Sequence, residues 1–164
     1  MSRADLDSGP GRVFILEAMR QLQHAAHREV EERLARAGYP DVRTPHINLL
    51  AYVPRGEGVR MSVLAARMEL TRGAITQLVA HLEGLGLVER IADPDDGRGV
   101  IVRPTGAADR GYEVARRALA EIEARWEEEV GIKTWATVSE ALERLATREN
   151  SRALDDRSAV PKGR

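Results

Sequence analysis

The stretch that decides the fold runs from Met61 to Thr105 and reads MSVLAARMELTRGAITQLVAHLEGLGLVERIADPDDGRGVIVRPT. Ser62 is a candidate N-cap for a helix over Val63–Met68, and Thr71 is a candidate N-cap for a second helix. Because only a few residues separate the two helices, they must cross at an angle. The apolar residues of the second helix recur at three- and four-residue steps and form one stripe: Ile75, Leu78, Leu82 and Leu85.

The rest of this stretch changes from a helical to a strand pattern. Leu87–Ile91 and Val100–Arg103 are short runs of β-prone residues, and the turn formers of Ala92–Gly99 separate them. This pattern predicts a hairpin with an extended tip. Helix, tight turn, helix and hairpin, in this order, make the winged variant of the helix-turn-helix. In that fold the second helix enters the major groove of DNA, and the hairpin reaches the adjacent backbone or minor groove.

Helical patterns flank the winged region on both sides. A long helix starts near Val13 and ends before Gly38. A short helix follows, with Thr44 as its candidate N-cap and Pro45 at its first position, and it stops before Pro54. After the hairpin, Thr105 is a candidate cap for a further helix, Gly131 interrupts it, and a last helix follows. The predicted fold class is therefore mainly α with a small β-hairpin wing.

Composition excludes several classes of protein. A chain of 164 residues with 43% hydrophobic content fits one globular domain with helical arms. It contains no cysteine, which excludes disulfides, thiolate zinc sites and thiol-based redox sensing. No signal peptide and no apolar run of about 18 residues is present, so we expect a cytoplasmic location and no membrane partner. The net charge is −1, so DNA binding would depend on where single arginines are placed.

The outward face of the second helix holds the first candidates for DNA contact. If the apolar stripe is buried, Arg72, Gly73, Thr76, Gln77 and Ala80 point outward. Arginine suits phosphate or guanine, and glutamine suits adenine. Threonine can bond a base or a phosphate or touch a thymine methyl, and the two small residues permit close approach. Taken alone, this face is equally well explained as an ordinary solvated surface.

The predicted wing tip adds a second group of candidates. Asp93–Gly99 holds one arginine, Arg98, among acids. The side chain of Asp96 can bond the turn or orient the guanidinium of Arg98. The alternative is a surface turn with an idle salt bridge.

Four motifs in order and at matching spacing resemble the multiple-antibiotic-resistance regulator (MarR) family. They are Ser62-Val-Leu-Ala-Ala, Thr71-Arg-Gly-Ala-Ile-Thr-Gln-Leu-Val, Leu82-Glu-Gly-Leu-Gly-Leu-Val-Glu-Arg90 and Asp93-Pro-Asp-Asp-Gly-Arg98. By position, Thr71 to His81 match the family's recognition helix, and Asp96 and Arg98 match its wing acid and arginine. His81 stands where that family commonly has an arginine. The resemblance covers about Val13 to Ala146 and implies a homodimer, a palindromic operator and often repression relieved by a small ligand.

Composition and helical periodicity, together with the dimerisation role that the resemblance implies, divide the chain into segments. These are a disordered tail over 1–11, a dimerisation helix and supporting helix over 12–60, the winged helix-turn-helix over 61–104, dimerisation helices over 105–147 and a flexible tail over 148–164. The apolar faces of the flanking helices exceed what one small winged domain can cover, as at Leu22, Ile122, Trp126 and Leu142. In the resembled family, ligands lie between the dimerisation helices and the winged domain. His46, Asn48 and Tyr52 could line such a crevice, or could merely cap or pack beside the core.

The remaining signals are weak. His24, His27 and Glu31 fall on successive turns of the first helix, but three polar residues there are more often a solvated face than a zinc site. We find no catalytic triad, paired-carboxylate context, phosphate loop or cysteine nucleophile, so we predict no enzyme, no metal and no cofactor. We expect double-stranded DNA, a second copy of the chain and a small-molecule effector as partners. The rival hypothesis is a winged-helix module that binds a protein on the same face without specific DNA binding.

Overall fold

The computed structural model describes residues 14–159, apart from the side chains of Arg98 and of residues 150–159. Two compact units make up this part of the chain, one up to Leu119 and one from Ala120. The tail predicted over residues 1–11 lies outside the described residues. The elements in chain order are α1 (Ile15–Arg36), α2 (Thr44–Ala51), β1 (Val59–Arg60), α3 (Met61–Arg67), α4 (Arg72–Gly84), β2 (Val88–Asp93), β3 (Asp96–Pro104), α5 (Gly106–Val130) and α6 (Ile132–Ala159).

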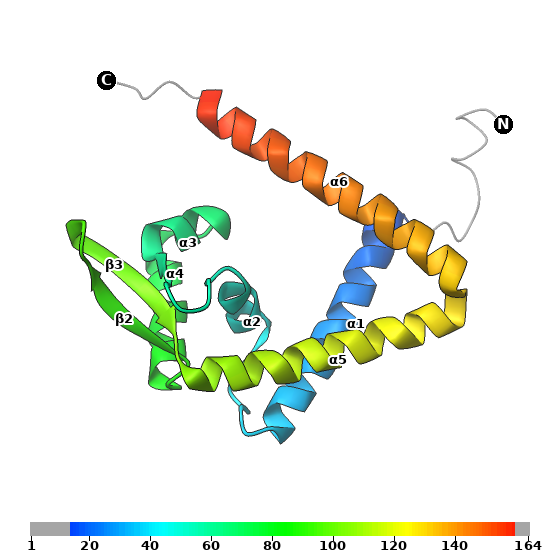
Figure 1. Ribbon diagram of the computed structural model, residues 1–164, viewed down its shortest axis with the longest axis horizontal. Helices are drawn as coiled ribbons and strands as arrows, with labels where there is room; N and C mark the ends of the chain where they lie inside the picture. Colours follow the sequence, from blue (N-terminus) through cyan, green and yellow to red (C-terminus); the bar gives the residue numbers. More distant parts are fainter. Residues whose placement is uncertain (1–13, 160–164) are drawn as a thin grey trace. The chain divides into compact units, whose positions relative to one another are not determined.

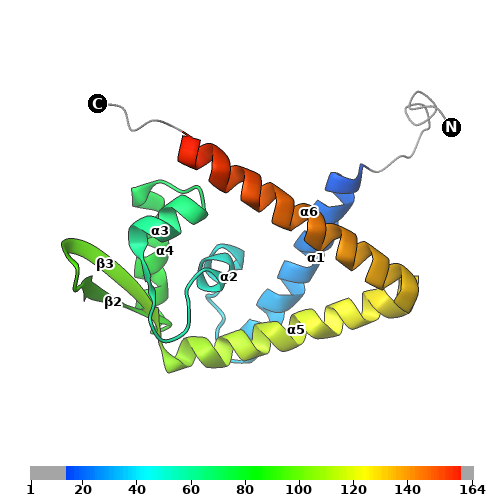
Figure 2. The same ribbon diagram turned by 45° about the horizontal axis from the view of Figure 1, so that its top comes forward.

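The first unit is a winged helix-turn-helix, which confirms the predicted fold class of helices with a small β-hairpin wing. Figure 1 shows the hairpin of β2 and β3 beside α3 and α4. Helix α2 packs against both α1 and α4, and the turned view in Figure 2 shows the same arrangement. The recognition-type helix α4 is therefore held between the wing on one side and α2 on the other.

The sheet has three antiparallel strands in the order β1-β3-β2. Sequence analysis did not predict β1, because two residues are too few to show an alternating pattern. Its approach to β3 depends on Gly58, which has φ +78°. A Cβ atom at Gly58 would lie 2.5 Å from the backbone oxygen of Val102, so only glycine fits there.

The core of this unit draws apolar side chains from every helix and from β2 and β3. A threonine cap starts α4 as predicted, because the Oγ1 atom of Thr71 accepts a hydrogen bond from the backbone N–H of Ala74 (3.2 Å). The buried stripe of α4 is Ile75, Val79 and Leu82. It differs from the predicted stripe because Val79 is buried, whereas Leu78 is only half-buried and Leu85 is 36% exposed. The largest fully buried side chains of this unit are Val30, Leu49, Leu64, Ile75, Val79, Leu82, Leu87 and Val102.

The wing tip is tighter than the extended tip that the sequence predicts. Asp93 pairs with Asp96 across the end of the hairpin, and the register shifts between Ala92 and Asp93. The shift leaves residues 97–99 of β3 without a partner in the ladder, as in a β-bulge. The eight turn-forming residues are thus shared between a short turn and the ends of both strands.

Three helix ends also differ from the sequence-based expectation. Helix α3 begins at Met61, so Ser62 lies inside it and is not its cap. Helix α2 begins at Thr44, whose hydroxyl and backbone N–H both donate to Glu31 Oε1 of α1 (2.6 Å each). Helix α6 continues to Ala159 where a flexible tail was expected from Arg148, because neither glycine nor proline interrupts residues 148–159.

Among the described residues, no helix combines the length and the apolar character needed to cross a membrane.

Candidate nucleic-acid interface

The residues predicted to contact DNA lie on one exposed face formed by α4 and the wing. Asp96 on the wing is exposed, and so is every predicted contact residue on α4 and at its cap. The residues on α4 and at its cap are Thr71, Arg72, Gly73, Thr76, Gln77, Ala80 and His81. Helix geometry causes this arrangement, because Ile75, Val79 and Leu82 occupy the opposite, buried stripe of α4. Arg98 lies in β3, and its side chain is outside the described residues.

The hydroxyl of Thr76 is already engaged within the protein. Its Oγ1 atom donates to the backbone oxygen of Arg72 (2.7 Å) and lies 3.7 Å from the sulfur of Met61. This bond to the preceding turn is common for threonine in a helix. The methyl group of Thr76 is therefore the part of this side chain that is available to a base.

A groove of about 500 Å³ separates the helix-turn-helix from the wing. Arg72 lines it from α4, and Asp96 and Gly99 line it from β3. Arg60 and Met61, where β1 meets α3, also line the groove. The recognition-type helix and the wing thus present their polar groups around one concave surface.

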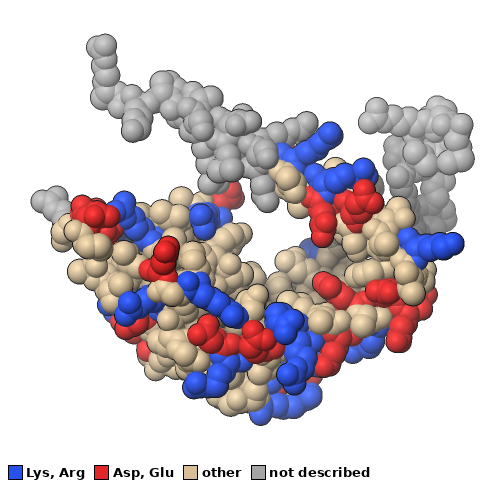
Figure 3. Space-filling view, viewed as in Figure 1, with Lys and Arg blue, Asp and Glu red and all other residues tan. Residues whose placement is uncertain are grey.

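Ion pairs within the winged region remove part of its positive charge. Arg90 pairs with Glu83, and Arg103 pairs with Glu89 at 2.8 Å. Arg67 and Arg72 have no acidic partner among the described residues, and both are exposed. Acidic and basic side chains are interspersed on the face seen in Figure 3, so no patch of one sign dominates that face. Any attraction for phosphate at α4 must therefore come from Arg72 and its neighbours.

A second acid, Asp93, contributes to the wing tip beside the predicted Asp96. Asp93 is 4% exposed, and its carboxylate forms an ion pair with Arg60. The hydrogen bond from Arg60, followed by the one from the backbone N–H of Asp95, lowers the pKa of Asp93. Sequence reasoning missed this pair because its members are 33 residues apart and no local pattern links them.

Two of the three predicted ligand-binding residues lie beside α4. His46 and Asn48 of α2 line a groove of about 600 Å³ together with Gln77 and His81 of α4. Tyr52 is not among the residues that line this groove and stands exposed at the end of α2. The structure therefore does not bring the three predicted residues together in one site.

The imidazole ring of His46 stacks on that of His81. The ring centroids are 4.5 Å apart and the planes differ by 9°. The Nδ1 atom of His46 accepts a hydrogen bond from the backbone N–H of Arg43 (3.0 Å). Burial, together with the neighbouring His81, lowers the pKa of His46.

A separate apolar cavity of about 160 Å³ lies on the other side of α2. Two of its polar side chains are engaged elsewhere: the Tyr39 hydroxyl donates to the backbone oxygen of Ala107 (3.1 Å), and Nε of Arg116 donates to Glu113 (3.1 Å). The cavity therefore suits a small apolar occupant. The lining residues are Leu34, Tyr39, Val42, Ile47, Leu50, Ala51, Leu87, Ala108, Gly111, Tyr112, Ala115, Arg116 and Leu119.

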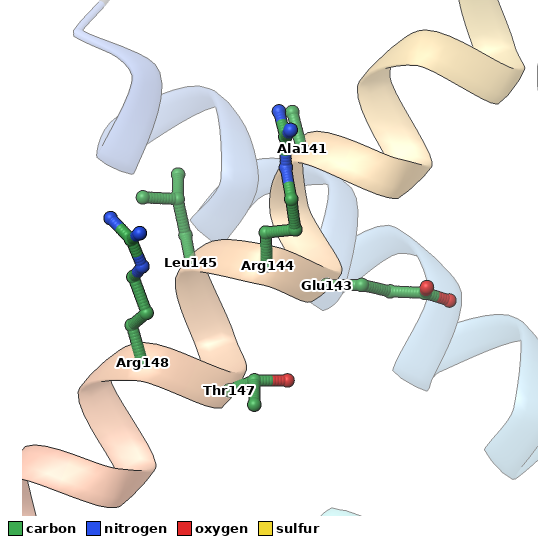
Figure 4. Close-up of a pocket in the computed structure, with 6 residues that line it drawn as sticks. All are labelled: Ala141, Glu143, Arg144, Leu145, Thr147 and Arg148. Carbon is green, nitrogen blue, oxygen red and sulfur yellow. The ribbon is translucent and has the colours of Figure 1, made fainter.

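A hollow of about 770 Å³ along α6 has no comparable lining. The residues that line it all come from that one helix. Figure 4 shows the side chains of Glu143 and Leu145 pointing away from the helix in different directions. A single helix cannot surround a small molecule, so this hollow is not a binding pocket.

Glu31, one of the three residues of the weak zinc-site hypothesis on α1, is engaged in hydrogen bonds within the protein. Glu31 accepts the two hydrogen bonds from Thr44 that start α2. Among the side chains that the structure describes, no group of three or more histidine, cysteine or acidic residues is arranged to hold a metal ion.

Comparison with known proteins identifies the winged region. The MarR family model matches residues 41–99, which extend from the loop before α2 to the wing. The search of curated proteins finds no match. The resemblance to the MarR family that was stated from the sequence motifs is confirmed by this match and by the solved structures.

Solved structures of MarR-family regulators share the fold over nearly their whole length. Wild-type MarR from E. coli in its apo form has a TM-score of 0.68 at 18% identity, covering 83% of this chain and 98% of that one. A MarR-family regulator from Rhodococcus sp. RHA1 has a TM-score of 0.63 at 24% identity, with 80% and 93% covered. The PcaV regulator from Streptomyces coelicolor, solved with its natural ligand, has a TM-score of 0.60 at 22% identity, with 90% and 98% covered. The Rhodococcus and Streptomyces proteins are described as transcriptional regulators, and at such identities the likeness establishes the fold.

Proposed function

We propose that this chain, which has the fold of the MarR-family transcriptional regulators, binds a palindromic DNA operator as a homodimer and represses transcription. One observation carries the proposal: every described residue on the outward face of α4 that was predicted to contact DNA is exposed. Arg72 at the start of that face has no acidic partner among the described side chains. Exposed polar groups beside an unpaired arginine, next to a wing, suit a DNA groove better than a protein surface.

The proposed roles follow from the chemistry of each side chain. Arg72 binds phosphate or guanine at the start of α4, where free backbone N–H groups also favour an anion. Gln77 reads adenine, and the Thr76 methyl contacts thymine. Gly73 and Ala80 allow the helix to approach the bases. Arg98 reaches phosphate or the minor groove from the wing.

Exposed apolar side chains support the homodimer. At the start of α1, Phe14 and Ile15 are 69% exposed and Leu16 is 75% exposed, and Leu22 further along the helix is 48% exposed. A lone chain rarely leaves so much apolar surface in water. The predicted dimer residue Ile122 is only 1% exposed, so it does not belong to such a face. The second unit adds its own exposed apolar residues, namely Val130, Ile132, Val138 and Leu145.

Helix α2 gives a route by which a ligand would release the operator. Its Ile47 and Leu50 line the apolar cavity, and its His46 and Asn48 line the groove against α4. An apolar cavity of about 150 Å³ is large enough for one benzene-sized molecule. We propose that such an effector shifts α2, which then displaces α4 from its DNA-binding position.

The test is to select bound sequences from random or genomic DNA and to titrate the enriched site at several salt concentrations. We expect an inverted repeat whose half-sites are about one DNA turn, roughly 34 Å, apart. Light scattering should give twice the chain mass. Arg72→Ala should reduce the slope of log affinity against log salt by about one unit per protomer.

Arg28→Ala is the matched control, because Arg28 is an exposed arginine on α1, outside α4 and the wing. It removes the same charge and should leave the slope unchanged. A chain that enriches no sequence, and whose weak binding responds equally to both substitutions, would be a protein-interaction module and not a regulator that reads DNA.

A further inference from the structure

Asp93 is joined to the start of the helix-turn-helix by a two-point contact. Its side chain is only 1% exposed, whereas that of Arg60 is 49% exposed. The Nε atom of Arg60 pairs with Oδ2 of Asp93, and Nη2 donates to Oδ1 at 3.3 Å. Arg60 ends β1 and directly precedes α3. This ion pair therefore links the last residue of β2 to the first helix of the DNA-binding region.

The same carboxylate organises the rest of the wing tip. Oδ1 of Asp93 accepts a hydrogen bond from the backbone N–H of Asp95 (3.0 Å), which closes the turn. Gly99 of β3 packs directly against Asp93: a Cβ atom at Gly99 would lie 2.7 Å from the Asp93 Cβ and 2.9 Å from its Oδ2. Arg98 is the residue immediately before this close contact. Three segments of the fold thus meet at one side chain.

Burying a carboxylate is unfavourable unless it is paired and hydrogen-bonded. A simple turn does not need such a group, since an exposed asparagine or aspartate serves the same purpose. What the buried pair adds is a fixed connection between the wing tip and α3, which an exposed tip cannot make. It also neutralises one of three acids, Asp93, Asp95 and Asp96, that would otherwise oppose DNA phosphates.

We infer that Arg60 and Asp93 are positioning residues for DNA binding, which hold the wing segment containing Arg98 at a fixed place relative to α3 and α4. The inference rests on the proposed function. Neither residue needs to touch DNA, because both act through the backbone position of residues 96–99.

Asp93→Asn separates positioning from simple charge. The substitution removes a negative charge near DNA, so if charge alone mattered the operator would bind more tightly. It also breaks the two-point contact with Arg60, so positioning requires weaker binding. We expect a loss on the order of tenfold, within the range of a lost arginine contact. Glu83→Gln is the charge-matched control, because it also removes one negative charge and breaks a different ion pair of the region, with Arg90, away from the tip.

Two further variants reach the same result without changing a charge. Arg60→Lys keeps the cation on a half-exposed side chain but cannot make the planar two-point contact. Gly99→Ala places a methyl group against Asp93 and pushes residues 97–99 away. Both should weaken operator binding although net charge is unchanged. Arg60→Lys alters only a half-exposed group, so it should fold even if Asp93→Asn does not, and thermal melts of each variant check this.

The final measurement is a double-variant test of whether the effect of Asp93→Asn on operator affinity depends on Arg98. If Asp93 acts through Arg98, then Asp93→Asn should weaken the wild type but add nothing to Arg98→Ala. The base preference set by Gln77 should be the same in all variants, since α4 itself is not altered. A purely structural role would change that preference as well.

The outcomes are separable from those of the proposed function. If the wild type selects no DNA sequence, the proposed function fails, and the inference fails with it. If the wild type binds an operator but Asp93→Asn binds it more tightly, or Arg60→Lys and Gly99→Ala bind as the wild type does, only the inference is overturned. An additive loss in the Asp93→Asn, Arg98→Ala double variant would overturn it too.

Discussion

The stacked rings of His46 and His81 join the recognition-type helix α4 to α2, with centroids 4.5 Å apart. This contact requires at least one neutral ring, since two imidazolium cations at that distance repel each other. The hydrogen bond from the Arg43 backbone N–H to Nδ1 of His46 also requires an unprotonated Nδ1. Other charged groups near His46 are Glu31 on α1, which opposes the lowering of its pKa, and Arg43, which adds to it.

Acid should therefore destabilise the fold through His46. Its folded-state pKa lies below the ordinary value of 6.5, so the unfolded chain binds the proton more readily. The stabilisation is present above about pH 6.5 and is lost as the pH falls toward the lower, folded-state pKa. Urea denaturation at several pH values between 7.5 and 5.5 measures this. In His46→Gln the decrease of unfolding free energy over that range should be smaller, and an equal decrease would show that His46 does not contribute.

Gly58 and Gly56 form a matched pair that separates backbone conformation from steric fit. Both have positive φ, +78° and +87°, but only Gly58 faces a backbone oxygen within contact distance. Gly56→Ala should cost about 1–2 kcal/mol of unfolding free energy, from conformation alone. Gly58→Ala should cost about 1–3 kcal/mol more, because its methyl group would overlap Val102. Similar losses in chemical denaturation would mean that the approach of β1 to β3 is not tight.

Base reading by α4 should depend on Gln77 and on the methyl group of Thr76. Gln77→Ala should cost about 1–3 kcal/mol at one base pair of each half-site and little on other DNA. Because the Thr76 hydroxyl is bonded to Arg72, Thr76→Val should keep the preference for thymine, and Thr76→Ser should lose it. Titration of operators with single base changes decides this. A uniform loss on all sequences would place these side chains on the DNA backbone.

Filling the apolar cavity should abolish ligand binding there. Ala115 lines the cavity from α5, so Ala115→Leu occupies much of the space of about 160 Å³. Benzene is a suitable probe, since it fits an apolar cavity of this size. It should raise the melting temperature of the wild type and not that of Ala115→Leu. Ala120→Leu, on an exposed position of the same helix, controls for the added side chain, and a shift that survives in Ala115→Leu would place the probe elsewhere.

Much of the fold could be predicted from the sequence because its signals are local. The helical period of α4, its Thr71 cap and the turn formers of the wing each involve residues within a few positions of one another. The exposed face of α4 follows directly from that period, and all of its predicted contact residues are exposed. Local rules failed in two places. Strand β1 has only two residues, too few to show a pattern, and Ser62 resembles the cap of α3 by residue type although the helix begins one residue earlier, at Met61.

The amino-acid sequence by itself determined the order of the elements, the wing and which side of α4 faces outward. Only the tertiary structure decided which distant side chains meet: Arg60 with Asp93, His46 with His81, and Gly58 with the backbone of Val102. It also decided that α2 separates an apolar cavity from the groove beside α4. The physical reason is that caps and periodicity act over one or two helical turns. Ion pairs, ring stacking and cavity walls instead join residues that only the packing of several elements brings within a few ångströms.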